Sequence, residues 1–182
     1  ANATKKAGEE FATQASKVDA LQKILNDSNQ TYSERIKALK ELKEIVPGYN
    51  AELTQEGEII SNNTKAIQDY LTKLEKQIKL KAAQEELEAA YREKRLKEKE
   101  IIQKQSAYDT ASAQVPDVAY GDAGANYQLY MLRQAGKAEK QLKQAQSELT
   151  GINKTIEELN QEINTTSLSL DDSTGTTKTY TE

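Results

Sequence analysis

The fold of this chain is decided by residues 131–163, which read MLRQAGKAEKQLKQAQSELTGINKTIEELNQEI. Their apolar side chains recur in alternating steps of four and three. The positions are Met131, Ala135, Ala138, Leu142, Ala145, Leu149, Ile152, Ile156, Leu159 and Ile163. This is the a and d spacing of a coiled coil, sustained for more than four heptads. We therefore predict one long helix whose apolar seam packs against a second helix, within the chain or between chains.

A second long helix is predicted upstream, over residues 64–113. Its apolar stripe begins with Ile67, Leu71, Leu74 and Ile78, and resumes with Leu80, Leu87, Tyr91, Ile101 and Tyr108. The phase slips between residues 78 and 80, as at a discontinuity in a heptad repeat. Residues 94–100 are nearly all polar, so we expect weak packing there. A helix of this length would extend ~75 Å.

The two long helices are joined by a predicted tip loop near residues 114–124, which contains Pro116 and Gly121. Two long helices with a short connection pack most simply as an antiparallel hairpin. With the loop centred near residue 118, residues whose numbers add up to about 236 should lie opposite each other. The expected pairs are Leu87 with Leu149, Leu80 with Ile156, and Ile101 with Ala135.

Two shorter helices are predicted before the hairpin. The first covers residues 5–26 and carries an apolar stripe from Phe11 to Leu25. The second opens with Thr31-Tyr32-Ser33-Glu34, the form of a capping box, in which Thr31 and Glu34 satisfy each other's free amide groups. It ends at Val46-Pro47-Gly48, because Pro cannot continue a helix and Gly accepts the left-handed cap.

These elements predict an all-α fold, in which a long antiparallel helical hairpin has two short N-terminal helices packed at its open end. Residues 1–60 form a head region, 61–165 the coiled-coil hairpin and 166–182 a disordered Ser/Thr-rich tail. Residues 50–63 could hold a helical turn around Leu53. Ile67, Leu71 and Leu74 lie beyond the predicted pairing, and the side chains expected to cover them are Phe11, Leu25, Ile36 and Leu42.

Composition excludes several kinds of chemistry. The 182 residues are 36% hydrophobic and 30% charged, with a net charge of −4, which is typical of long amphipathic helices. There is no Cys and no His, so thiolate metal sites, thiol nucleophiles and imidazole bases are impossible. No apolar stretch reaches the ~20 residues that span a bilayer. We expect no enzyme activity, no catalytic residue, no cofactor, no metal and no small-molecule substrate.

Three polar clusters invite a chemical interpretation, and each has a simpler one. The carboxylates around Glu85–Glu88 and Glu157–Glu162 have lysines and arginines within a turn or two, so solvated ion pairs are expected. Residues 171–182 superficially resemble a calcium loop, but position six is Thr176 instead of Gly. Residues 65–104 carry a net charge of +3, yet interleaved Glu residues break the basic stripe, so we expect a solvated helix face and no nucleic-acid partner.

Tyrosines concentrate at the predicted hairpin tip. They are Tyr108, Tyr120, Tyr127 and Tyr130. They could close the end of the coiled coil, where aromatic side chains bury much area, or they could contact a protein partner. Both interpretations are open at this stage.

Residues 10–100 resemble phage tail tape measure proteins, particularly those of prophages in Bacteroidota-like bacteria. The likeness lies in the order of several stretches and covers about half of the chain. These stretches are the short first helix, the Asn/Ser/Thr-rich break, YSERIKALKEL at residues 32–42, VPGY at 46–49 and KAAQEEL at 81–87.

The resemblance implies a structural role. Such proteins run inside the tail tube during assembly, set its length and leave with the DNA at infection. This chain would be an internal helical fragment, assembled in the bacterial cytoplasm into the virion tail. Its partners would be tail tube or assembly proteins, or other copies through the seam. The alternative is a surface or secreted coiled-coil module that binds a receptor through the tyrosine-rich tip.

Overall fold

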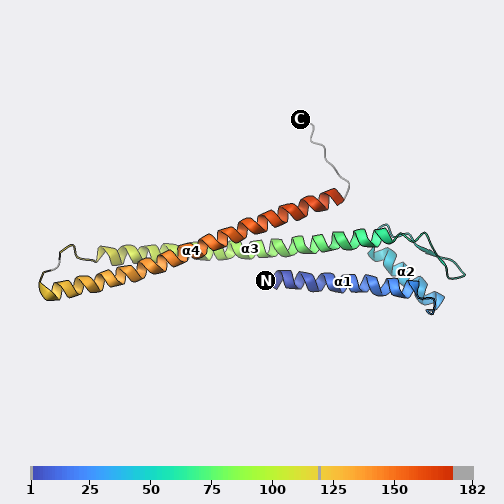
Figure 1. Cartoon of the computed structure of the whole chain (residues 1–182), viewed down its shortest axis with the longest axis horizontal. Coiled ribbons are helices and arrows are strands. Elements are labelled where there is room, and N and C mark those ends of the chain that lie inside the picture. The colour runs from blue at the N-terminus through green and yellow to red at the C-terminus, as the bar shows by residue number, and fades with distance from the viewer. Residues whose placement is uncertain (1, 119, 174–182) are drawn as a thin grey trace, which may run out of the picture. The chain divides into compact units, whose positions relative to one another are not determined.

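The computed structural model describes residues 2–118 and 120–173, and the chain is 83% helical. The elements in chain order are α1 (Asn2–Asn26), α2 (Tyr32–Ile45), β1 (Glu52–Leu53), β2 (Ile59–Ile60), α3 (Thr64–Ala113) and α4 (Gly121–Ser173) (Figure 1). The predicted all-α hairpin with two short N-terminal helices is therefore confirmed.

The chain divides into two compact units. The head unit comprises Ala1–Glu85 and Glu162–Glu182, and the hairpin unit comprises Glu86–Gln161. This partition differs from the predicted one, which placed the first boundary at residue 60. The difference arises because the first turns of α3 contribute to the core of the head unit, where Ile67 is buried.

The core of the head unit lies between α1, α2 and the start of α3. Its buried residues are Val18, Leu21, Leu25, Ala38, Leu39, Leu42, Val46, Tyr49, Ala51 and Ile67. Leu25 and Leu42 thus cover Ile67, and Leu71 packs against the same cluster, as predicted. Phe11 and Ile36 are only half-buried and lie outside this cluster.

The buried side of α2 is turned by one residue from the predicted face, because it includes Arg35 in place of Ile36. Arg35 is 8% exposed, and its Nε donates a hydrogen bond of 2.8 Å to the carbonyl oxygen of Leu25. That carbonyl belongs to the last turn of α1, where helix carbonyls have no partner within the helix. Arg35 therefore caps α1 from the following helix.

The start of α2 has the predicted capping box. The amide of Glu34 donates to Thr31 Oγ1 at 3.3 Å, and the amide of Thr31 donates to Glu34 Oε2 at 3.0 Å. Thr31 Oγ1 also donates to Glu34 Oε2 at 2.7 Å, and this hydrogen bond, followed by the one from the Thr31 amide, lowers the pKa of Glu34. The break between α1 and α2 is therefore fixed by local hydrogen bonding.

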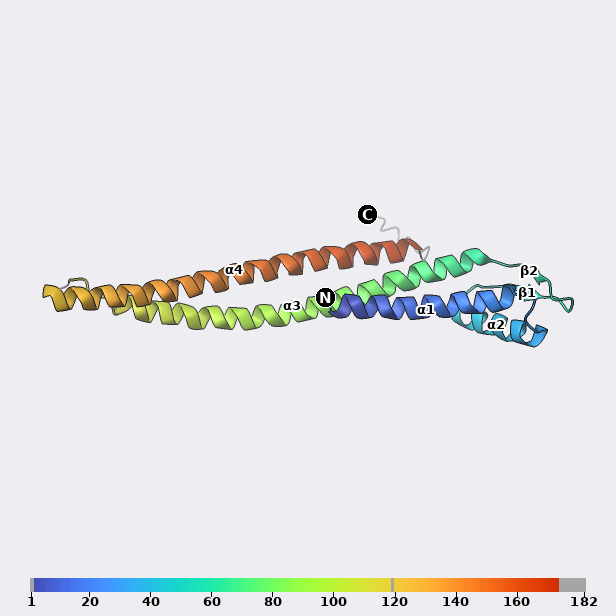
Figure 2. The same cartoon turned by 60° about the horizontal axis from the view of Figure 1, so that its bottom comes forward.

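Residues 52–60 form a small β-hairpin, so the predicted helical turn around Leu53 is wrong. Leu53 pairs with Ile59 in an antiparallel register, and both lie half-buried against the head core. The turn closes with a hydrogen bond of 3.0 Å from the amide of Gly57 to the carbonyl of Thr54. Gly57 has φ +86°, a conformation that favours glycine. Figure 2 shows β1 and β2 beside the C-terminal end of α1.

Two predictions about helix ends are corrected by α4. It begins at Gly121, so residues 121–124 belong to the helix and not to the predicted loop of residues 114–124. It continues to Ser173, so residues 166–173 are helical instead of disordered. Within the head unit, Lys76 Nζ donates a hydrogen bond of 3.1 Å to the carbonyl oxygen of Ser169 in this part of α4. The remainder of the predicted tail lies outside the described residues.

The register of the hairpin also differs from the prediction. Lys97 Nζ lies 2.6 Å from Glu148 Oε2, so facing residues have numbers that add up to 245 and not 236. The predicted pair of Leu87 with Leu149 is therefore wrong, and the other two predicted pairs are out of register by the same amount. The cause is the loop. Its non-helical residues rise further per residue than a helix does, and they carry the start of α4 past the end of α3 by about eleven helical residues, or ~16 Å.

Gln128 shows how the loop returns along α4. Its Nε2 donates to the Pro116 carbonyl at 2.8 Å. The loop therefore lies beside the first turns of α4, in the place that α3 occupies further along the hairpin (Figure 1). The start of α4 consequently extends beyond α3 and has no helix packed beside it in the hairpin unit.

Candidate functional site

Two features of the hairpin unit stand out: a seam that contains lysines and a tip that exposes apolar side chains. The ten predicted seam residues of α4 are all buried or half-buried within this single chain, with Met131, Leu142, Ala145, Ile156 and Leu159 the most buried. The prediction for the facing side of α3 needs correction. Tyr91, predicted in its stripe, is 43% exposed, and its neighbour Ala90 is buried.

The seam of α3 keeps a strict alternation of three and four residues. Its half-buried or buried positions are Leu87, Ala90, Lys94, Lys97, Ile101, Lys104, Tyr108 and Ala111. Three of these eight positions carry lysine, which hides the repeat from a search for apolar residues. The polar stretch at residues 94–100 is therefore part of the seam and not a gap in it.

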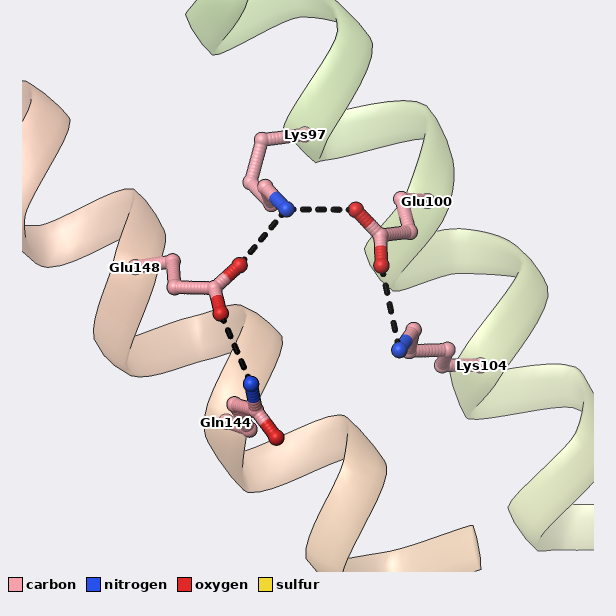
Figure 3. Close-up of polar contacts among 5 residues, drawn as sticks. All are labelled: Lys97, Glu100, Lys104, Gln144 and Glu148. Carbon is pink, nitrogen blue, oxygen red and sulfur yellow. Dashed lines mark hydrogen bonds and ion pairs between the residues drawn. The ribbon is translucent and has the colours of Figure 1, made fainter.

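Lys97 is the centre of a polar network across the seam (Figure 3). Its Nζ contacts Glu100 of its own helix and Glu148 of α4, each at 2.6 Å. Glu100 also pairs with Lys104 at 3.0 Å, and Gln144 Nε2 donates to Glu148 at 3.0 Å. Two carboxylates from different helices thus share one ammonium group, which fixes the register of α3 against α4.

Hydrogen bonding within the network shifts its titration. The hydrogen bonds to Glu100 and Glu148 raise the pKa of Lys97. The hydrogen bond from Lys97 is the largest cause that lowers the pKa of Glu148, and it also lowers the pKa of Glu100. The Lys97 side chain is 18% exposed, so its methylene stem fills the seam while its charge is neutralised. All three groups are therefore held in their charged forms near neutral pH.

The tip of the hairpin unit exposes large apolar side chains. They are Val118, Tyr120, Tyr127, Leu129, Tyr130 and Leu132, with Tyr120 the most exposed at 83%. The side chains on α4 are exposed because α4 extends beyond α3, so its first turns have no covering helix in the hairpin unit. Val118 and Tyr120 precede α4 in the chain. Of the four predicted tip tyrosines, Tyr108 is half-buried in the seam and the other three belong to the exposed cluster.

Three apolar members of the cluster were missed by the sequence reasoning: Val118, Leu129 and Leu132. Leu129 and Leu132 flank Met131, the first seam residue, so the sequence places apolar side chains on nearly every side of the helix there. A helix that is apolar on all sides is normally buried. That pattern is the signal that could have revealed this surface.

The charge around the tip is mainly acidic, with Arg133 beside Leu132 as the nearest basic residue on α4. Between Lys104 and Arg133 the chain has no basic residue and three acidic ones, Asp109, Asp117 and Asp122. Asp109 accepts a hydrogen bond from Gln105 at 2.8 Å. Among the described residues none of the three carboxylates has an ion-pair partner, so the tip combines apolar area with unneutralised negative charge.

The other clusters considered from the sequence show ordinary surface pairing. Glu88 pairs with Arg92 at 3.3 Å and Glu158 with Lys154 at 3.6 Å, as expected. Residues 2–118 and 120–173 contain no acidic cluster able to hold a metal ion, and no helix among them has the length and apolar character needed to cross a membrane. The calcium-loop candidate involves side chains outside the described part of the chain.

Comparison with known proteins adds no relative to this description. No family model, no curated protein sequence and no solved structure matches the chain. The functional argument therefore depends on the residues themselves.

Proposed function

We propose that this chain is an internal structural part of a phage tail tape measure protein, which sets the length of the tail tube during assembly and has no catalytic role. The observation that carries the proposal is the pair of helices of 50 and 53 residues, and the order of stretches in residues 10–100, which resembles that of tape measure proteins, supports it. A ruler needs a fixed conversion of residue number into distance, and a helix supplies ~1.5 Å per residue.

The seam suits a hairpin that opens when the protein is extended inside a tube. Lysines at seam positions give a less stable pairing than Leu or Ile would, because part of the seam must neutralise charge instead of burying apolar area. Once separated, α3 and α4 expose solvated lysines and glutamates along this section. In the proposed role, the isolated chain is a hairpin and the assembled chain is straight.

A matched deletion tests the ruler and its state together. Residues 87–100 and 145–158 face each other in the observed register, so removing both segments keeps the remaining seam aligned. If the chain lies straight in the tail, the tail should shorten by ~42 Å; if it remains a closed hairpin, by ~21 Å. Tail length would be measured by electron microscopy of particles from the bacterium that encodes the chain.

The control replaces the same two segments with Ala/Glu/Lys-rich helical sequence of equal length, which should leave tail length unchanged. Mass spectrometry of sedimented tails should also find peptides of this chain in filled particles and lose them from emptied ones. Tails of unchanged length in the deletion strain, or tails without these peptides, would reject the proposal.

A second candidate function is a surface or secreted binding module that uses the hairpin tip. The exposed apolar cluster favours it, since large apolar patches on helical proteins commonly mark protein contacts. In that case Tyr127→Ala with Tyr130→Ala should abolish binding to host cells and leave helix content unchanged by circular dichroism. A variant that binds as well as the original chain would remove this candidate.

A further inference from the structure

The hairpin unit has a second exposed surface that complements its tip. On the outer side of α3, Tyr91 and Ile102 are 43% and 70% exposed. They are eleven residues apart, which is three helical turns, so they lie on one side of the helix about 16 Å from each other. Neither belongs to the seam. We call this surface the α3 outer face.

The α3 outer face is basic where the tip is acidic. Of the five basic side chains in residues 91–99, Lys94 and Lys97 belong to the seam and Arg92 pairs with Glu88. Arg95 and Lys99 remain on the outer side, where the exposed Glu98 offsets one of their two charges. Arg95 lies between Tyr91 and Ile102 on the same side of the helix, with Lys99 close by. Arg95 and Lys99 have no ion-pair partner in the described part of the chain. The outer face therefore combines exposed apolar side chains with a net positive charge.

We propose that the tip of one copy of this chain docks on the α3 outer face of a second copy. The contact brings the tip carboxylates, Asp117 and Asp122 in particular, to the free Arg95 and Lys99 of the next copy. It also places the exposed tyrosines of the tip against Tyr91, Ile102 and a guanidinium group, which binds aromatic rings through cation–π contact.

Charge favours the contact of a tip with an outer face over a contact between two tips or between two outer faces. Two tips in contact would bring together six aspartates and two arginines, the Arg133 of each copy, and would carry a net negative charge, whereas two outer faces would bring together two surfaces of net positive charge. An acidic tip is also repelled by the anionic surface of a membrane. Of these pairings, the one between the tip and the outer face joins apolar area with opposite net charge.

The arrangement is a head-to-tail contact. Each copy offers one tip and one outer face, so a further copy can add to the first, and the assembly grows as an open chain unless the rotation between copies closes a ring. Six side chains at a tip form a small contact, in the class of weak interfaces below ~1,200 Å². The inference uses the same tip as the second candidate function, and it names a second copy of this chain as the protein that the tip binds.

Sedimentation equilibrium of the isolated chain tests the proposal. At low salt the weight-average mass should at least double between about 10 μM and about 500 μM, and it should fall back towards the monomer at high salt. Two variants should each be monomeric: a tip variant, Tyr127→Ser with Tyr130→Ser, and a face variant, Arg95→Glu with Ile102→Glu. A matched control, Tyr32→Ser, removes an equally exposed tyrosine from the head unit and should associate like the original chain.

Mixing the two variants gives the decisive result. The tip variant keeps its outer face and the face variant keeps its tip, so an equimolar mixture should form a dimer that grows no further. Circular dichroism should show unchanged helix content in every variant, because all the substituted side chains are exposed.

A monomeric original chain at all concentrations, or variants that associate like the original, would each overturn the proposal. Since the assay uses the isolated chain, its failure leaves the tail-length experiment unaffected. If the chain is monomeric but the Tyr127 and Tyr130 substitutions still abolish host binding, the tip binds another protein.

Discussion

Lys97 of α3 and Glu148 of α4 are 51 residues apart in the chain, and their charged groups are 2.6 Å apart in the structure. Lys97 simultaneously contacts Glu100, which pairs with Lys104. A polar contact at a seam position penalises other alignments of the two helices, because any slip leaves the charges without their partners. This ion pair therefore specifies the register more than it adds to the stability.

The register can be checked by thiol cross-linking. The chain has no cysteine, so introduced pairs are the only reactive thiols. Lys97→Cys with Glu148→Cys should be joined efficiently by a bifunctional thiol reagent of about 8 Å reach. Leu87→Cys with Leu149→Cys should not, because these positions are separated by about 13 Å along the helix axes. Preferential cross-linking of the second pair would contradict the observed register.

Replacing a seam lysine with leucine should stabilise the hairpin. Lys94 is half-buried in the seam and has no ion-pair partner among the described residues. Lys94→Leu should raise the free energy of unfolding by about 1–2 kcal/mol, because it adds apolar burial without leaving a charge unpaired. Urea denaturation followed by circular dichroism measures this. The control is Lys99→Leu, on the exposed side of the same helix, which should change stability little; an equal gain there would disprove the seam assignment.

Acid should weaken the hairpin through Glu148 and Glu100. Their folded pKa values lie below the ordinary value of 4.5, mainly because Lys97 hydrogen-bonds to both. A lowered folded pKa adds stability that is complete above pH 4.5 and is lost as the pH falls through the folded value. The pKa of Lys97 is raised in the folded chain, so its contribution to stability is lost only in strong alkali, as the pH rises through that raised pKa.

The midpoint temperature of thermal unfolding should therefore decrease as the pH is lowered from 5 to 3. The decrease should be smaller in a variant with Lys97→Met and Glu148→Met. This pair of substitutions removes the contact across the seam and leaves the remaining surface carboxylates in place. An identical acid response in the two proteins would show that the network does not contribute.

Arg35→Met should destabilise the head unit. The substitution keeps the aliphatic stem but removes the hydrogen bond to the Leu25 carbonyl, leaving a buried acceptor unpaired at a cost of about 1–3 kcal/mol. Lys37→Met, on the exposed side of α2, is the matched control and should change little. Equal unfolding midpoints for the two variants would show that Arg35 does not cap α1.

The seam of α4 could be predicted because every one of its a and d positions is apolar. The matching seam of α3 could not, because Lys94, Lys97 and Lys104 hold seam positions and the exposed Tyr91 sits next to the buried Ala90. Hydrophobic periodicity detects residues that bury apolar area, and a lysine that buries only its stem gives no such signal.

The errors of register and of the β-hairpin have a common origin in chain segments without a repeat. The path of residues 114–118 depends on tertiary contacts such as that of Gln128 with Pro116, which no local pattern encodes. Likewise, Leu53 and Ile59 pair because the head core offers them a surface. The capping box at Thr31 was predictable, since both of its hydrogen bonds join residues three apart.

The first turns of α4 are held in their helical shape by backbone hydrogen bonds, and the side chain of Gln128 adds one hydrogen bond to the loop. Backbone groups in such a segment exchange with solvent through local opening, at far lower cost than those in the seam. Tyr127 and Tyr130 are therefore carried on a part of the helix that can unwind and re-form while Leu142 and Leu159 keep the rest of α4 in place. A surface that changes conformation at a low free-energy cost can adapt to the shape of its partner. Amide hydrogen exchange at residues 121–130 would measure the free energy of this local opening.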